Sequence, residues 1–447
     1  MNRIAKTLLS LFSLALTAGA AYGQDTQPMS LQQCIDYALQ HQAQVRSARI
    51  DEAISLETNK EVTGQALPQV SATGSFQDNV VIQKQLIDAS MFDPTVPKGT
   101  LVPFEFGIQY NAVGSITLSQ TLFDPSVMVA LQARKTLEEL AHKSVLQTER
   151  DTRVAVSKAY YNVLINRKQM VLVDDNISRI EQLLRETDAM YKNGFAEKLD
   201  IDRTNVQLTN LRSEKTKLSN LMHVGELLLK FQMGMPMKDQ LTLSDTLNFS
   251  GLRETLGDAP FDYSRRIDYS LLETQKRVNE FDLKRYKLAK LPTLTFSGTV
   301  GTNRASTRFD YFNLNNTWYG YGVIGLDLHI PIFSGFQQNH RIQKARLNVE
   351  KSQVALDNMK QSIDLELDQT HSTLESNLLT LQAQERNMKL AEDVYNTTKK
   401  KYQAGVGSNL EVVNAENDLK QAQTNYFSAL YDAIISKIDY QKAVGQL

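Results

Sequence analysis

The segment YGVIGLDLHIPIFSG, residues 321–335, decides how this chain folds. Its apolar residues recur at every second position, as Ile324, Leu326, Leu328, Ile330 and Ile332. A period of two places alternate side chains on opposite faces of a β-strand. From Gly335 to Lys401 the pattern changes to helical spacing. The segment therefore predicts a strand, Tyr321 to Phe333, that crosses at Pro331–Gly335 into a long helix.

Three more segments have the same alternation, at 112–123, 291–300 and, more weakly, 70–76. Their polar faces are small and rich in Ser and Thr, and their length is close to what a tilted strand needs to cross a bilayer. Aromatic residues cluster at one end of the predicted hairpins, as an interfacial girdle requires: Phe104, Phe106, Tyr110, Phe309, Tyr311, Phe312, Trp318, Tyr319 and Tyr321. These features favour a membrane barrel over the alternative, aromatic residues packed in a soluble core.

The chain contains two copies of one unit. Residues 66–70 resemble 290–294, residues 122–124 resemble 332–334, and YKNG at 191–194 resembles YQAG at 402–405. The copies differ mainly in a longer, proline-bearing loop in the first, at 83–105. The predicted organisation is a first repeat at 24–234, a connecting segment at 235–262 and a second repeat at 263–447.

Long helices make up most of each copy. Apolar residues in heptad spacing predict helices at 125–190 and 335–401, each followed by a glycine turn and a returning helix, at 200–231 and 410–443. This spacing is typical of antiparallel coiled-coil packing. Shorter helices are predicted at 31–64 and 263–289, before the strands of each copy.

Residues 1–23 are expected to be a secretory signal peptide. Arg3 and Lys6 precede a short apolar run, and Ala21-Tyr22-Gly23 supplies the small residues that signal peptidase reads. Beyond it no apolar run reaches about 18 residues, so no transmembrane helix is expected. An exported chain of this kind is periplasmic, secreted or an outer-membrane β-barrel.

Composition argues against several other classes of protein. The net charge is −1, which gives no field to attract nucleic acid. The single cysteine, Cys34, cannot form an intrachain disulfide and is expected to be a buried helix residue. The motif at Gly320–Gly325 matches a dinucleotide fingerprint but leads into a strand rather than a helix. The six His are scattered and no catalytic motif is present, so no metal, cofactor or enzymatic activity is expected.

Four strands cannot close a barrel, because a closed barrel needs about eight. Open edges cannot face lipid with unpaired backbone groups, so the barrel must be shared between chains. At this point the repeat, the crossing at Pro331–Gly335, the turns at Gly194 and Gly405 and the ending KAVGQL at 442–447 resemble the TolC family of outer-membrane efflux channels. The resemblance covers the whole mature chain.

The resemblance implies an α+β membrane protein of the cell outer membrane. Members of the family are homotrimers, in which each chain adds four strands to a lipid-embedded barrel of about twelve strands. A long α-helical coiled-coil tunnel continues the barrel into the periplasm. The expected partners are a periplasmic adaptor, or membrane fusion protein, and an inner-membrane pump. The expected function is a passive conduit for efflux or export, gated at its helical tips.

The resemblance also implies site residues at these tips. The expected aperture residues are Asp200 and Glu411, which match acidic positions of the family, Asn414, which stands where a second acid is often found, and Tyr402, a hydrogen-bonding tether. The turns expected to contact the adaptor contain Gly194, Phe195, Gly405, Val406 and Gly407. For Asp200 and Glu411, a charge that merely favours a helix N-terminus is the alternative.

Two other functions remain open. The chain could be the outer component of a type I protein secretion system, which uses the same architecture. It could also be a periplasmic coiled-coil scaffold with a β cap, which predicts solubility without detergent.

Overall fold

The computed structural model describes residues 28–245, 261–311 and 317–447, so the predicted signal peptide lies outside the described residues. The chain forms two compact units. We call Met1–Ala48, Val145–Ile267 and Gln361–Leu447 the helical unit, and Arg49–Ser144 and Asp268–Lys360 the strand unit. Each unit takes residues from both predicted repeats. The repeat boundaries therefore describe the sequence pattern and remain a prediction.

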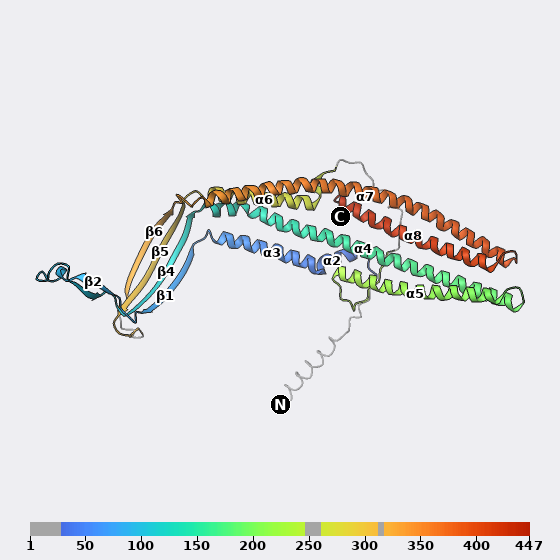
Figure 1. Cartoon of the computed structure of the whole chain (residues 1–447), viewed down its shortest axis with the longest axis horizontal. Helices are drawn as coiled ribbons and strands as arrows, with labels where there is room; N and C mark the ends of the chain where they lie inside the picture. The colour runs from blue at the N-terminus through green and yellow to red at the C-terminus, as the bar shows by residue number, and fades with distance from the viewer. Residues whose placement is uncertain (1–27, 246–260, 312–316) are drawn as a thin grey trace, which may run out of the picture. The chain divides into compact units, whose positions relative to one another are not determined.

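The strand unit is built on one antiparallel sheet (Figure 1). Its strands are β1 (Gln69–Asp78), β4 (Tyr110–Phe123), β5 (Thr293–Ser306) and β6 (Tyr319–His329). They are hydrogen-bonded in the order β1-β4-β5-β6. Within the described residues, β1 and β6 each have one neighbour, so both outer edges of the sheet are open.

The two faces of this sheet differ as the alternation predicts. Ile116 lies opposite Ala72 on one side and Val300 on the other, so apolar side chains line one face. On the other face, hydroxyl groups pair across the strands: Thr73 with Ser115 at 2.9 Å and Thr117 with Thr299 at 3.1 Å. The apolar face is open to solvent in the single chain; Ile324, for example, is 80% exposed.

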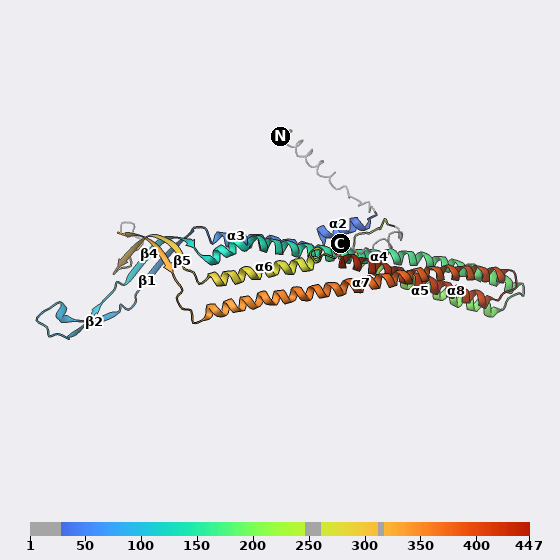
Figure 2. The same ribbon diagram turned by 90° about the horizontal axis from the view of Figure 1, so that it is seen from above.

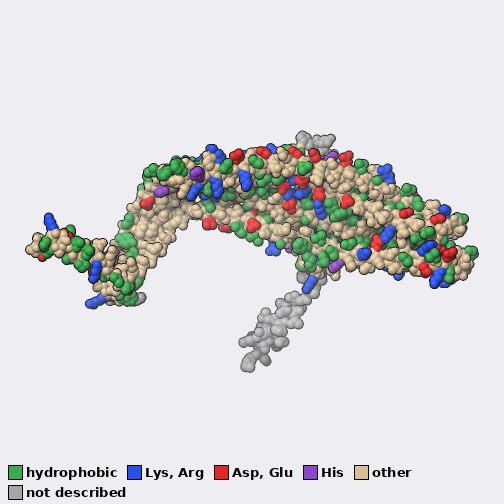
Figure 3. All heavy atoms as spheres, in the orientation of Figure 1, with side chains coloured by type: hydrophobic (Ala, Val, Ile, Leu, Met, Phe, Trp, Pro, Cys, Tyr) green, Lys and Arg blue, Asp and Glu red, His purple; other side chains and the backbone are tan. Residues whose placement is uncertain are grey.

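Charged groups are distributed unevenly. In the four strands of the sheet the residues that carry formal charge are Asp78, Arg304 and Asp327. The visible face of the helices, by contrast, carries Lys, Arg, Asp and Glu side chains interspersed (Figure 3). Among the described helices, none combines the length and the apolar character that crossing a membrane requires.

The strand ends and the long loop depart from the sequence prediction. β5 continues to Ser306, and β6 ends at His329, so residues 330–333 lie outside the strand. Pro331 explains the early end, because proline has no N–H to give to a ladder. The loop predicted at 83–105 contains a small hairpin, β2 (Lys84–Asp88) and β3 (Leu101–Glu105). The Asp88 carboxylate closes this hairpin by accepting the backbone N–H groups of Ser90 and Gly99.

The first predicted helix is broken in two. The structure has α2 (Leu31–His41) and α3 (Ala43–Gly64), because Gln42 adopts an extended conformation with ψ 130°. Gly234, at φ 70°, lies so close to this break that an added Cβ would be 2.7 Å from the His41 carbonyl oxygen. The helix predicted at 263–289 becomes a short 3-10 turn at Tyr263–Arg265 followed by α6 (Ile267–Leu288).

Two long helical hairpins form most of the helical unit. The first is α4 (Pro125–Lys192) with α5 (Lys198–Met233), and the second is α7 (Gln337–Gln403) with α8 (Asn409–Ala443). Their ends agree with the predicted helices within three residues. Near the turns the two helices of each hairpin lie side by side in both views (Figures 1 and 2). One apolar cluster joins all four helices near these turns, with Ile180, Leu211, Tyr395 and Leu419 in its interior.

A second apolar core surrounds the start of α2. Cys34 and Ala38 pack against Tyr160 of α4 and Leu229 of α5. Cys34 is fully buried, as expected from the sequence. Burial, and secondarily the charge of Asp245, raises the pKa of its thiol to about 12.

This environment predicts a cysteine that does not react while the protein is folded. The thiolate is the nucleophile in this reaction, and the raised pKa leaves almost none of it at pH 8. We expect maleimide to label Cys34 only after unfolding, as measured by mass spectrometry. A Ser219→Cys variant, on the exposed side of α5, is the matched control for reagent activity. Labelling of native Cys34 at the rate of that control would contradict the buried placement.

Candidate functional site at the hairpin tips

The two glycine turns are exposed and unobstructed. Gly194 has φ 80° and Gly405 has φ 76°, and an added Cβ would meet no atom within 4 Å at either. The positive φ, rather than close packing, is what favours glycine there. Phe195 is 83% exposed and Val406 is 74% exposed. Gly407 differs, because an added Cβ would lie 3.1 Å from the backbone nitrogen of Tyr402.

The predicted aperture acids lie at the starts of the returning helices. Asp200 is the third residue of α5, and its Oδ2 accepts the backbone N–H of Glu197 at 3.4 Å. Glu411 is the third residue of α8, and its backbone N–H donates to the Ser408 hydroxyl at 3.2 Å. Both carboxylates therefore sit where the helix dipole favours negative charge. This supports the alternative interpretation and leaves the aperture role a prediction.

The surroundings of these acids differ in exposure. The Glu411 side chain is 53% exposed and lies 3.8 Å from Lys401. Asn414 is also exposed and lies three residues further, on the same face of α8. The Asp200 side chain is 21% exposed and lies 3.6 Å from Arg203. Of the predicted acids, Glu411 is thus the more accessible.

Tyr402 points into the protein, where it joins a buried polar node. We define this node as Thr187, Thr204, Tyr402 and Asn409, one residue from each helix of the two hairpins. The Tyr402 and Thr187 hydroxyls are 3.2 Å apart. The Asn409 amide donates to Thr187 at 3.1 Å and to Thr204 at 3.5 Å. The tether predicted for Tyr402 has a partner in the structure, whereas its gating role stays a prediction.

A second buried network lies further along the same helices. Arg179 of α4 donates to both carboxylate oxygens of Glu416 on α8, at 3.4 Å each. Asn176 contacts Arg179 and donates to Gln423 of α8 at 3.1 Å. The guanidinium of Arg179 also lies 5.5 Å from the centre of the Tyr395 ring of α7. These contacts join the first hairpin to the second.

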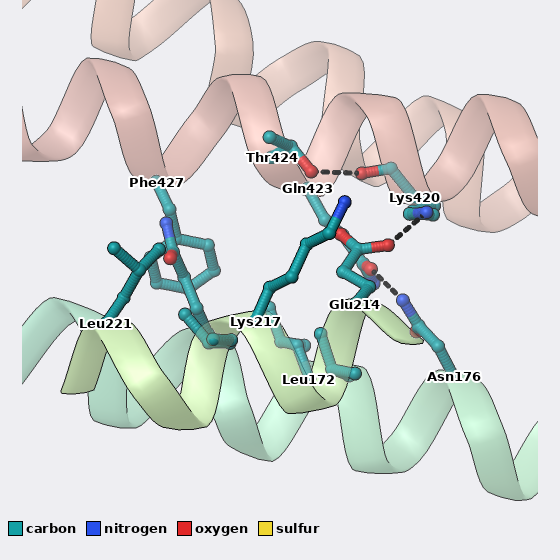
Figure 4. A pocket seen from close by; sticks show the side chains of 12 residues that line it. Leu172, Asn176, Glu214, Lys217, Leu221, Lys420, Gln423, Thr424 and Phe427 are labelled. Carbon is teal, nitrogen blue, oxygen red and sulfur yellow. Dashed lines mark hydrogen bonds and ion pairs between the residues drawn. The ribbon is translucent and has the colours of Figure 1, made fainter. Parts of the chain in front are cut away.

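A cavity of about 200 Å³ adjoins this network, between α4, α5 and α8. Leu221 and Phe427 lie at one end of it, and an ion pair between Glu214 and Lys420 lies at the other (Figure 4). The amide pair of Asn176 and Gln423 forms part of the wall. The junction of the two hairpins is therefore both polar and incompletely filled.

The sequence analysis did not identify Arg179, Glu416, Thr187 or Asn409. A signal was available on α8, where Val412, Glu416, Leu419, Gln423 and Phe427 recur every three or four residues. A charged or amide side chain at such seam positions has to meet a partner from another helix. In the returning helix predicted at 200–231, Lys215 continues the spacing of Thr204, Leu208 and Leu211 but is exposed and pairs with Asp174.

Other candidate motifs do not form sites. The glycines of Gly320–Gly325 all lie within strand β6, so no helix N-terminus follows them. Among residues 28–245, 261–311 and 317–447, no group of three or more His, Cys, Asp or Glu could hold a metal ion.

The family follows from a direct match. Residues 34–234 and 281–446 match the family described as outer membrane efflux protein. This chain belongs to that family. As an outer membrane efflux protein, it provides a passage across the cell outer membrane and extends a helical part into the periplasm.

Several relatives resemble this outer membrane efflux protein over most of their length. It is 20% identical to the proteases secretion protein PrtF of Dickeya chrysanthemi, over 99% of this chain and 92% of that protein. It is 24% identical to the outer membrane protein TolC of Escherichia coli (strain K12), over 76% of this chain and 71% of TolC.

Solved structures show the same fold. CmeC, an outer membrane channel of Campylobacter jejuni, is 15% identical, with a TM-score of 0.74 over 95% of this chain and 88% of that one. VceC, an outer membrane protein of Vibrio cholerae, is 14% identical, with a TM-score of 0.70 over 93% and 96%. The predicted TolC-like fold, with long helices and a four-stranded sheet, is thus confirmed for this outer membrane efflux protein.

The polar node predicts how firmly the hairpin tips are held together. Tyr402→Phe removes one buried hydrogen bond, which contributes about 1 kcal/mol. Asn409→Asp places a carboxylate in the same site and costs more. Spin labels on Ser219→Cys of α5 and Gln421→Cys of α8 report the hairpin separation by pulsed electron paramagnetic resonance.

We expect about a fivefold gain in separated hairpins for Tyr402→Phe and a larger gain for Asn409→Asp. Tyr191→Phe, an exposed residue near the end of α4, is the matched control. Equal distance distributions in the wild type and both node variants would show that the node does not hold the tips.

Proposed function

We propose that three copies of this chain form one conduit, closed at its periplasmic end by the hairpin tips and opened through contact with an adaptor and its inner-membrane pump. The observation that carries the proposal is the pair of open sheet edges, β1 and β6. In lipid, unpaired backbone N–H and C=O groups cost several kcal/mol each. Pairing β1 of one copy with β6 of the next satisfies both edges at once.

The faces of the sheet support this arrangement. The apolar face, which includes Val70, Ile116 and Leu326, is exposed in the single chain and suits contact with lipid. The Ser- and Thr-rich face suits a water-filled interior. The aromatic residues Phe76, Tyr110, Phe309 and Tyr311 pack together at the end of β1 and β4, where an interfacial girdle is needed.

The helical unit carries two apolar stripes that also call for neighbouring copies. At 3.6 residues per turn, each stripe falls within an arc of about 80° or less. On α5 the stripe consists of Leu199, Val206, Leu221, Val224, Leu228 and Phe231. The same arc also holds Arg203, Asn210, Ser213 and Lys217. On α7, within the helical unit, it consists of Leu365, Leu379, Leu390 and Val394.

The two stripes lie on different hairpins, so they favour a head-to-tail contact in which α5 of one copy packs against α7 of the next. Such a heterologous interface closes into a ring when the rotation between copies allows it. A ring of three copies with four strands each gives about twelve strands, enough to close a barrel.

Type I protein secretion is the second candidate. It is favoured by the near full-length match to PrtF and by a 21% identical match to the alkaline protease secretion protein AprF of Pseudomonas aeruginosa. The efflux relatives include the pyoverdine export protein OpmQ of the same species, 25% identical. Copurification with the adaptor and pump of either system separates the two candidates.

The periplasmic scaffold is a third class, and it predicts a protein that fractionates without detergent. The conduit predicts an outer-membrane oligomer that runs as a trimer on gels until it is heated. Finding the chain only in the soluble periplasmic fraction would rule the conduit out.

Disrupting a stripe should disrupt the trimer. Leu221→Glu combined with Leu228→Glu places two carboxylates in the proposed α5–α7 contact, where burial without a partner costs several kcal/mol. We expect the heat-sensitive trimer band to be lost. Thr216→Glu, also exposed on α5 but about 90° from the stripe, should leave the band unchanged. A trimer in both variants would exclude α5 from the interface.

The aperture acids should set conductance and ion selectivity. A ring of three Glu411 side chains favours cations and impedes anions. Neutralising Glu411 and Asp200 together, as Gln and Asn, should change the conductance and lower the cation preference in planar bilayers. Glu375→Gln, exposed on α7 far from the tips, is the control. Unchanged conductance and reversal potential would rule out these acids as the aperture.

A further inference from the structure

The junction of the two hairpins encloses an acidic group. Glu416 of α8 is only 1% exposed, whereas its partner Arg179 is 26% exposed. Both donor–acceptor distances are 3.4 Å, longer than the 2.7–2.9 Å of a good charge-assisted bond. The carboxylate has therefore lost most of its hydration, and the long hydrogen bonds from Arg179 replace it only in part. Separation of the hairpins would expose the carboxylate to water and restore its hydration.

The charged groups around Glu416 come from α4, α7 and α8. Arg179 faces it from α4, and Lys399 and the Tyr395 ring face it from α7. Lys420 lies one turn along α8 and is itself paired with Glu214 of α5. Burial raises the pKa of Glu416, and the three cations lower it by less, so the pKa is raised overall. Burial and the Glu416 charge raise the pKa of Tyr395 to about 12, which keeps that phenol neutral.

The closed junction bears further local costs. The Tyr395 hydroxyl and the Asn409 side-chain oxygen are buried and have no hydrogen-bond partner among the described residues. A buried polar atom without a partner costs about 1–3 kcal/mol. Side chains that line the cavity beside Asn176 also lose van der Waals contacts on that side. Separation of the hairpins lets water reach all of these groups.

We propose that Glu416 is a proton-controlled element of the hairpin junction, which favours separated hairpins when ionised and closed hairpins when protonated. This inference rests on the proposed function, since it names a regulator of the same hairpin tips. It assigns Glu416 a positioning role in opening rather than contact with the transported molecule.

The direction follows from proton linkage. In separated hairpins the Glu416 carboxylate meets water and has an ordinary pKa, near 4.3 for model peptides. In closed hairpins its pKa is raised. The closed state therefore binds the proton more tightly. Its stability is greatest below the ordinary pKa and falls as the pH rises toward the raised value. One proton per chain changes the ratio of the two states by at most about tenfold per pH unit.

Two measurements test the proposal between about pH 4 and pH 8. The first is the distance between spin labels on Ser219→Cys and Gln421→Cys, in purified protein. The second is the single-channel conductance in planar bilayers. In the wild type, we expect longer distances and more frequent opening as the pH rises. Glu416→Gln should stay closed and lose this pH dependence.

Two further variants sharpen the test. Arg179→Gln removes the main countercharge, so closed hairpins with an ionised Glu416 become less stable and the pKa of Glu416 in the closed state rises further. The loss of closed hairpins should therefore continue to higher pH and end with a larger separated fraction than in the wild type. Glu392→Gln is the matched control, because Glu392 is an exposed carboxylate on α7. It should reproduce the wild-type profile.

The outcomes are distinct. A wild-type pH profile in Glu416→Gln, or in Arg179→Gln, would overturn the role of Glu416. If Glu416→Gln does not assemble, the Arg179→Gln profile decides. Absence of the heat-sensitive outer-membrane trimer in the wild type would instead overturn the proposed conduit, while the spin-label distances would still report on Glu416.

Discussion

Backbone hydrogen bonding at the edges of a four-stranded sheet is the constraint on which the rest of this structure depends. Inside the sheet, β4 and β5 are paired on both sides over most of their length. β1 and β6 are paired on one side only among the described residues. Their free N–H and C=O groups can face water in a single chain but not lipid. The exposed apolar face and the open edges are consequently one problem, and the proposed pairing between copies of the chain solves both.

Local patterning was sufficient to predict most of this fold from sequence. The alternation of Ser115, Ile116, Thr117 and Leu118 gave the faces of β4 correctly, and heptad spacing gave the long helices within three residues. Both signals depend on residues that are close in sequence, and the two copies reinforced each other.

Features that depend on distant contacts were missed. The helix break at Gln42 lies against Gly234, which is almost two hundred positions away in the sequence. The β2–β3 hairpin depends on Asp88 binding the Gly99 amide across a loop. In the candidate site, the glycine turns were predicted from the sequence pattern, and the Tyr402 tether was implied by family resemblance. Glu416 was not predicted, because its burial and its pairing with Arg179 of α4 involve residues that are distant in sequence.

The small β2–β3 hairpin has a consequence for how such chains diverge. Its ladder is separate from the main sheet, and the pairing of β1 with β4 runs without a shift up to Asp78 and Tyr110. Residues can thus be inserted or removed between Asp88 and Leu101 without changing the register of any strand in the sheet. Sequence changes in this hairpin therefore leave the pairing of the main sheet intact. Related chains can acquire new surface epitopes here at little cost to the folding of the sheet.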